Sequence, residues 1–297
     1  MRYDDVLGVI GDTPLVGVHA LSPNPDVRIW AKLEGQNPGG SSKDRIARKM
    51  IELAEADGRL QPGATILEPS SGNTGIGLAL VAKLRGYSLR VVMPENVSVE
   101  RRQLLEIFGA EITLSPGEEG SNGAIRLSEK LGADDPSLVR LFQYGNPANP
   151  LAHYERTGPE IWRDCPGVDV FVAGLGTSGT FMGTGRRLRE ANPSIRLISF
   201  QPDSPLHGLE GLKHMETAIV PGIYDSSLAD EDMRVSTEDA YTMVRRLARE
   251  AGLLVGISGG AALAGALKVA KSARNAVIVT IFPDSADKYM SERFWNA

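Results

Sequence analysis

The chain has 297 residues, of which 42% are hydrophobic and 23% are charged, a composition typical of soluble globular proteins. A formal net charge of −5 at pH 7 and the lack of a Lys/Arg run argue against a nucleic-acid surface. The single cysteine, Cys165, excludes an intrachain disulfide, and no apolar run reaches the length of a membrane span. The N-terminus shows no apolar signal segment, so we expect a cytoplasmic protein with no nucleic-acid or membrane partner.

Strand-like and helix-like runs alternate along the chain. The first strand is predicted at 27–33, where apolar side chains alternate with Arg28, Trp30 and Lys32, and a helix follows Lys43. The further predicted strands are 65–68, 88–93, 111–114, 139–142, 168–173, 195–200 and 276–282. The further predicted helices are 74–84, 98–108, 122–131, 149–164, 180–191, 236–250 and 260–272, with a capping box at Ser236. This order predicts an α/β fold with parallel sheets covered by helices on both faces.

One stretch breaks this alternation. Residues 201–233 are rich in Pro, Gly, Ser and Asp and are too long for a simple connection. Stretches of this kind are usually functional lids or disordered segments, and we expect one of the two here.

Four segments join a predicted strand to a helix, which is where open α/β sheets bind ligands. The first, 37–45 (NPGGSSKDR), places Lys43 in the first turn of a helix. The partial positive charge of a helix N-terminus disfavours an ammonium, which lowers the lysine pKa and favours Schiff-base formation. Taken alone, the segment fits a capped helix with an exposed lysine better.

Two further segments have the composition of anion cradles. In 68–75 (EPSSGNTG), backbone N–H groups at a helix start offer a carboxylate site, and Asn73 can donate to a cofactor oxygen. The alternative is a tight turn that Ser and Asn merely cap. In 174–180 (GLGTSGT), the residues from Gly176 to Thr180 can wrap a phosphate. That segment also matches the dinucleotide fingerprint, but Gln201 stands where an acidic ribose ligand is expected.

The fourth segment is 255–261 (VGISGGA), in which Ser258 can meet a heterocyclic nitrogen, although by itself it reads better as a helix N-cap. Together the four segments supply an amine, a phosphate cradle, a carboxylate cradle and a neutral partner for a ring nitrogen. These are the parts that a pyridoxal 5′-phosphate (PLP) site needs. The scattered histidines form no metal set, and no G-x-S-x-G elbow supports a hydrolase.

The same segments resemble, in the right order, motifs of the cysteine synthase and cystathionine β-synthase family. They correspond to its cofactor-lysine, substrate-loop, phosphate-loop and pyridine-serine motifs, and 11–15 (GDTPL) and 143–149 (QYGNPAN) fit as well. The similarity runs from about residue 7 to about residue 290. Further matches at 98–102, 157–162 and 220–224 place the chain nearest to cysteine synthase B.

The resemblance implies fold type II of PLP enzymes, the tryptophan synthase β-like fold. In that fold PLP lies between two parallel-sheet α/β domains, usually in a homodimer. The smaller, mobile domain is expected to span 38–146. The larger, PLP-binding domain is expected to combine 1–37 with 147–297.

The resemblance also implies which residues form the site, with Lys43 as the catalytic residue. The implied cofactor-binding residues are Lys43, Asn73, Gly176, Thr177, Ser178, Gly179, Thr180 and Ser258. The implied substrate-binding residues are Ser70, Ser71, Gly72, Asn73, Thr74, Gln143 and Lys213.

The implied activity is a β-replacement that makes L-cysteine from an activated L-serine and sulfide or another sulfur donor. The activated serine is O-acetyl-L-serine or O-phospho-L-serine, and Lys43 moves the Cα proton. The segment Lys213-His214-Met215 stands where cysteine synthase B has two arginines and a tryptophan. Lys213 either favours an anionic substrate or is a solvated loop lysine.

Three alternatives remain at this stage. A cystathionine β-synthase type enzyme would use homocysteine as the nucleophile. A nicotinamide oxidoreductase would rest only on the glycines of 174–179 and leaves Lys43 and Ser258 unexplained. A non-catalytic paralogue would bind PLP without turning over an acylated serine.

Overall fold

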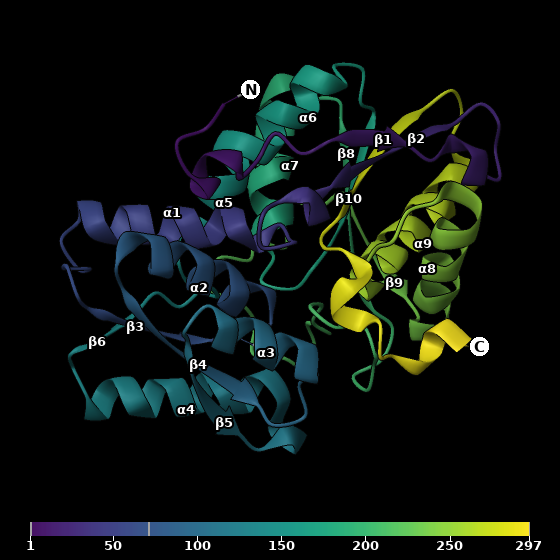
Figure 1. The fold of residues 1–297 in the computed structure, drawn as a ribbon. Coiled ribbons are helices and arrows are strands. Elements are labelled where there is room, and N and C mark those ends of the chain that lie inside the picture. Colours follow the sequence, from purple (N-terminus) through teal and green to yellow (C-terminus); the bar gives the residue numbers. More distant parts are fainter. Residues whose placement is uncertain (1, 71, 297) are drawn as a thin grey trace. The chain divides into compact units, whose positions relative to one another are not determined.

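The chain, described here by a computed structural model covering residues 2–70 and 72–296, divides into two compact units. The first unit combines Met1–Ile10 with Pro38–Asn149, and the second combines Gly11–Asn37 with Pro150–Ala297. Each unit is built on a sheet of its own (Figure 1). Within the described residues, no helix has both the length and the apolarity needed to cross a membrane.

The first unit contains a parallel sheet with the strand order β5-β4-β3-β6. Its strands are β3 (Thr65–Pro69), β4 (Ser88–Pro94), β5 (Glu111–Ser115) and β6 (Leu138–Arg140). Its helices are α1 (Lys43–Ala56), α2 (Asn73–Arg85), α3 (Val99–Ile107) and α4 (Gly120–Asp134). Val92 packs with Ala124 of α4, whereas Val91 lies against Gly75 of α2. Neighbouring strand residues therefore face opposite helical layers, as the pleat requires.

The second unit contains a sheet with the strand order β1-β2-β10-β7-β8-β9. Its strands are β1 (Leu15–Gly17), β2 (Arg28–Leu33), β7 (Val170–Gly174), β8 (Arg196–Pro202), β9 (Glu231–Val235) and β10 (Val277–Phe282). The parallel arrangement predicted from the sequence is confirmed for β2 and its neighbours from β10 to β9. Strand β1, which the sequence did not predict, pairs antiparallel with β2. The connection between β1 and β2 is too short for a parallel crossover.

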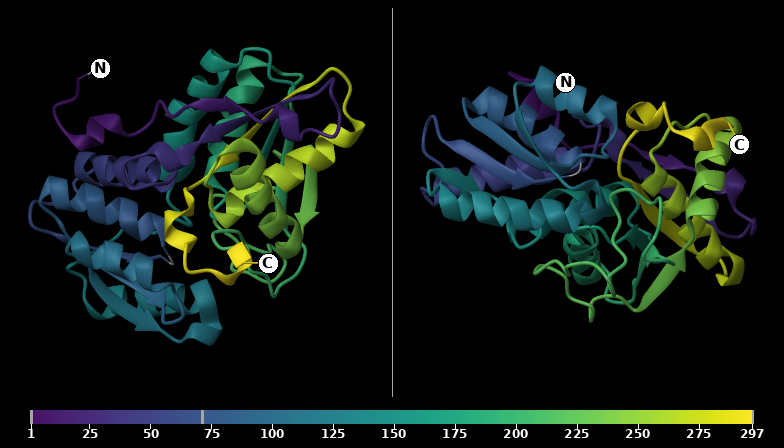
Figure 2. Two further views of the ribbon diagram at one scale, coloured as in Figure 1. Left: turned by 45° about the vertical axis from the view of Figure 1, so that its right-hand side comes forward. Right: turned by 90° about the horizontal axis from the view of Figure 1, so that it is seen from below.

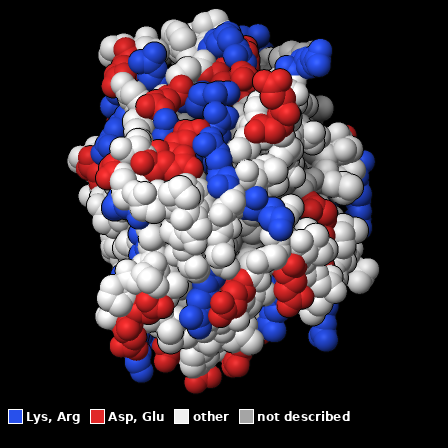
Figure 3. Space-filling model, turned by 60° about the vertical axis from the view of Figure 1, so that its left-hand side comes forward, with Lys and Arg blue, Asp and Glu red and all other residues white. Residues whose placement is uncertain are grey.

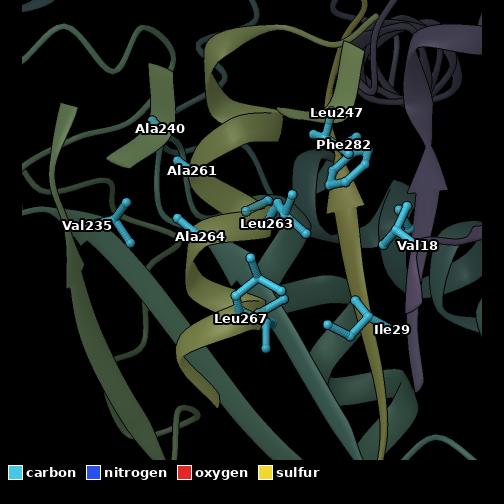
Figure 4. Packing of buried hydrophobic residues seen from close by; sticks show 14 of the residues in the cluster. Val18, Ile29, Val235, Ala240, Leu247, Ala261, Leu263, Ala264, Leu267 and Phe282 are labelled. Carbon is cyan, nitrogen blue, oxygen red and sulfur yellow. The ribbon is translucent and has the colours of Figure 1, made fainter. Parts of the chain in front are cut away.

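Helices cover both faces of this second sheet. They are α6 (Gly158–Asp164), α7 (Gly179–Ala191), α8 (Thr237–Ala251) and α9 (Ile257–Ser272). Val172 of β7 belongs to the apolar cluster around α9, whereas Phe171 belongs to the cluster around α7. Figure 2 shows α8 and α9 side by side. Figure 4 shows α9 side chains such as Leu263 and Leu267 among residues from the strands and from α8.

The predicted helix at 149–164 is interrupted. It consists of α5 (Ala148–Ala152), one π-helical turn (His153–Thr157) and α6. Such turns shift the facing of the side chains that follow and often occur at functional sites.

The irregular stretch 201–233 ends in β9, a strand that the sequence did not predict. Strand β9 lies at the edge of the sheet, where charged residues are common. Its charged residues Glu231, Asp232 and Arg234 hide the apolar pattern that would predict a strand. The capping prediction at Ser236 is confirmed, since its Oγ accepts a hydrogen bond from Asp239 N at 3.0 Å.

On the face drawn in Figure 3, acidic and basic side chains are interspersed.

Candidate cofactor and substrate site

Lys43 is the first residue of α1. Its backbone N–H donates to Ser41 Oγ at 3.2 Å, and Gly39 N donates to the buried Asp44 carboxylate at 2.5 Å. These bonds fold the glycine pair back onto the helix start. The Lys43 side chain is partly buried rather than fully solvated.

The start of α1 packs directly on α2. A Cβ added at Gly77 would lie 3.1 Å from the Lys43 carbonyl oxygen and 3.2 Å from Asp44 N. A side chain at position 77 would require these backbone atoms to move, so glycine allows the two helices their close approach. Since α2 begins at Asn73, Gly77 brings the turn that carries Lys43 close to the 70–74 loop.

The 70–74 loop and Gln143 meet within the first unit. Ser70 Oγ accepts hydrogen bonds from Gly75 N at 2.9 Å and Gly72 N at 3.3 Å. Thr74 Oγ1 donates to Gln143 Oε1 at 2.7 Å. Ser71 lies outside the described residues. A buried helix start with hydroxyl and amide groups beside it has the chemistry of a carboxylate site.

The 176–180 loop precedes and begins α7. Ser178 has φ +69° and a buried Oγ for which the described residues offer no hydrogen-bond partner. A Cβ added at Gly176 would overlap the Gly211 carbonyl oxygen. An unsatisfied buried hydroxyl is costly, and an acceptor-rich group such as a phosphate would satisfy it. Together with Gly179 at the helix start, the loop fits the phosphate of PLP.

His153 supports this loop, a role that no local pattern in the sequence predicts. The ring is fully buried; its Nε2 lies 3.2 Å from Thr180 Oγ1 and its Nδ1 lies 2.9 Å from Thr157 Oγ1. The π-helical turn beginning at His153 connects these groups, but no sequence pattern announces such a turn.

Ser258 is not the N-cap that its segment suggested. Helix α9 starts at Ile257 after an extended Gly256, so Ser258 lies in the first turn with 6% of its surface exposed. Gly256 N donates to Asp284 O at 3.1 Å, which places this helix start just beyond the carboxyl end of β10. Because β7 runs parallel to β10 beside it, Ser258 and the 176–180 loop lie at the same edge of the sheet.

Lys213 is not a solvated loop lysine, since only 7% of it is exposed. Its backbone N–H donates to Leu175 O at 2.8 Å, which holds the residue beside the segment that leads into the 176–180 loop. Burial lowers the pKa of the Lys213 ammonium to about 8.

The expected site residues thus form two groups, one in each unit. The first unit contains Lys43, Ser70, Gly72, Asn73, Thr74 and Gln143. The second unit contains Gly176, Thr177, Ser178, Gly179, Thr180, Lys213 and Ser258.

A family model for the pyridoxal-phosphate dependent enzymes matches residues 6–284. The chain belongs to this family. Its cofactor is PLP, its fold is type II, and the predicted resemblance to cysteine synthases is confirmed. The family match leaves the nicotinamide alternative without support.

Named relatives agree with this assignment. The chain is 46% identical to a cysteine synthase of Aquifex aeolicus over 99% of its own length and 92% of the relative's. It is 42% identical to cysteine synthase B of Salmonella typhimurium, with 95% and 93% covered. A crystal structure of O-ureido-L-serine synthase superposes with a TM-score of 0.94 at 38% identity, covering 100% of this chain and 96% of that one.

Replacing Gly176 by alanine should weaken PLP binding. The added Cβ would overlap the Gly211 carbonyl oxygen, so the loop would have to move. Overpacking of this kind costs about 1–3 kcal/mol, which corresponds to a rise of about 5-fold to 150-fold in the PLP dissociation constant. Fluorescence titration of the apoenzyme measures it. Gly167→Ala is the control, because an added Cβ there meets nothing within 4 Å; equal affinities in the two variants would contradict the assignment.

Proposed function

We propose that this chain catalyses a β-replacement, converting an activated L-serine and sulfide to L-cysteine with PLP as cofactor. The main support is the nearly full-length identity to two cysteine synthases. The geometry adds that Lys43, the one lysine expected to carry PLP, stands at a helix start packed beside a carboxylate-type loop.

Each group has a defined task in this proposal. The bound cofactor supplies an electron sink for the reaction at Cα. The Lys43 amine would hold the cofactor in the resting enzyme and would remove and return the Cα proton. Ser70, Ser71, Thr74 and Gln143 hold the amino-acid carboxylate.

The second unit would hold the cofactor's phosphate and ring nitrogen. The 176–180 loop receives the phosphate, and Ser258 offers a hydroxyl to the pyridine nitrogen. A neutral hydroxyl does not keep that nitrogen protonated as a carboxylate would. Ser258 would thereby moderate the electron withdrawal that the cofactor supplies, which would favour prompt loss of the β-substituent.

The leaving group is the finer part of the proposal. Lys213 places a buried ammonium near the phosphate-loop segment, which favours a substrate with an anionic leaving group such as O-phospho-L-serine. O-acetyl-L-serine is the alternative. The likeness to O-ureido-L-serine synthase is a reason to vary the nucleophile as well, because that enzyme's name implies a different product.

A product analysis tests the proposal. The holoenzyme is mixed with O-acetyl-L-serine or O-phospho-L-serine, in each case with sulfide or homocysteine. We expect L-cysteine from sulfide, and a Lys213→Met variant that loses more activity with the phosphorylated donor than with the acetylated one. If cystathionine is the main product, the chain is instead a cystathionine β-synthase type enzyme that uses homocysteine. No product with PLP bound would identify it as a non-catalytic paralogue.

We further propose that the enzyme is a cytoplasmic homodimer. The family resemblance supports the dimer, and a single cysteine is compatible with a reducing compartment. Light scattering on the purified holoenzyme tests the mass, and a monomer at micromolar concentration would contradict this proposal.

A further inference from the structure

We propose that Glu68 is a positioning residue that fixes Gln143 for binding the substrate's carboxylate. This inference rests on the proposed function, because it assumes that Gln143 binds an amino acid. Glu68 is the last residue before the Pro-Ser-Ser-Gly-Asn loop, and its side chain is fully buried.

The Glu68 carboxylate binds two consecutive backbone N–H groups. Its Oε2 accepts from Phe142 N at 2.7 Å and its Oε1 accepts from Gln143 N at 2.9 Å. Both oxygens are therefore used on one turn that lies more than seventy residues away in the chain. A buried carboxylate is costly, and only such strong hydrogen bonds make it tolerable.

The turn that Glu68 holds is strained. Phe142 has φ +54°, in the left-handed region that non-glycine residues rarely adopt. Residues persist there only where the surroundings determine the conformation, and they gather at functional sites. The two bonds from Glu68 do this at the residue directly before Gln143.

This turn determines the orientation of the Gln143 side chain. Its Oε1 accepts from Thr74 Oγ1 at 2.7 Å, and its Nε2 donates to Pro69 O at 3.3 Å. Pro69 follows Glu68 directly, so one short segment binds both the backbone and the side chain of Gln143. If the Glu68 bonds are lost, the turn can relax and the amide moves away from the 70–74 loop.

The protonation state of Glu68 decides whether its carboxylate accepts both backbone hydrogen bonds. Arg140 is the nearby cation, and its guanidinium lies 5.1 Å from the Phe142 ring centroid; Tyr144 is the other titratable neighbour. Burial raises the pKa of Glu68 to about 7. Because the pKa is raised to about 7, Glu68 is mostly ionised above pH 7 and becomes mostly protonated as the pH falls below 7. A protonated oxygen accepts poorly, so substrate binding should weaken on the acid side.

A double-mutant cycle tests the role of Glu68. Glu68→Gln keeps the size but places an N–H donor against a backbone N–H. We expect the KM for the amino-acid substrate to rise about tenfold or more, with kcat changed much less and the cofactor absorbance unchanged. In a Gln143→Ala background the same change should alter KM less than about twofold, because the two residues act through one another.

The pH profile adds a readout that a purely structural role would not move. Wild-type KM should rise as the pH falls below 7, whereas Glu68→Gln should remove that rise. Glu68→Asp keeps two acceptors, so it should recover part of the affinity, and it replaces Glu68→Gln in the cycle if that variant fails to fold. An unchanged KM in Glu68→Gln, or equal losses in both backgrounds, overturns the inference.

A titration with L-serine separates this test from the proposed function. Binding of L-serine to the holoenzyme is followed by cofactor absorbance and needs no turnover. If cysteine formation fails but L-serine binds, the same cycle of dissociation constants still decides whether Glu68 acts through Gln143. If L-serine does not bind the wild type, both the carboxylate site and the role of Glu68 are wrong.

Discussion

Lys43→Ala should abolish covalent attachment of PLP and lower the rate of cysteine formation by about 10³-fold or more. Loss of a positioned proton-transfer group alone costs about 10²–10⁴-fold, and this variant also loses the amine that bonds the cofactor. Borohydride reduction of the holoenzyme followed by peptide mapping measures the attachment, and steady-state kinetics measures the rate.

Lys43→Arg is the matched control. It keeps a positive charge at the start of α1 but offers no amine that can form an imine, so it should fail like Lys43→Ala. Both variants should retain the wild-type fold, because Lys43 is only partly buried. A reduced label on another lysine, such as Lys213, would show that the assignment is wrong.

Lys32→Met should lower the free energy of unfolding by about 3 kcal/mol. The Lys32 ammonium is fully buried, lies 2.8 Å from Glu160 Oε2 and donates to Thr13 O at 2.6 Å. Removing it takes a cation away from the buried Glu160 carboxylate. Arg156 compensates weakly, because its Nε is 3.7 Å away and its side chain is 46% exposed. Urea denaturation of the holoenzyme, fitted separately for each variant, measures the loss.

The double variant Lys32→Met/Glu160→Gln provides the control for this prediction. Since it also removes the negative charge of Glu160, it should recover most of the lost stability, as replaced buried pairs often do. If the single and double variants are equally unstable, the loss comes from packing of the lysine stem and not from the charge.

Local motifs in the sequence predict the candidate site, but they do not predict the contacts that support it. Lys43 and Gly176 stand in dense local motifs, where helix-start chemistry can be read within a few residues. Glu68 and His153 act through partners far along the chain or through a π-helical turn, so no local pattern reveals them.

The same reasoning explains the errors in the fold. Ser258 has the residue type of an N-cap, but Gly256 takes that position and α9 begins earlier. Strand β9 carries polar residues because it lies at a sheet edge, which hides the alternation that marked the inner strands. Strand β1 has only three residues, too few for the alternation of apolar and polar side chains that predicts a strand.

The burial of α9 has a consequence for local dynamics. Most of its residues are enclosed between the strands and α8, so their amide protons can exchange with deuterium only when much of the second unit opens (Figure 4). The exposed residues of the mostly irregular stretch between β8 and β9 are not enclosed in this way and should exchange far sooner. Ser258 would therefore present its hydroxyl from one of the slowest-opening parts of the chain.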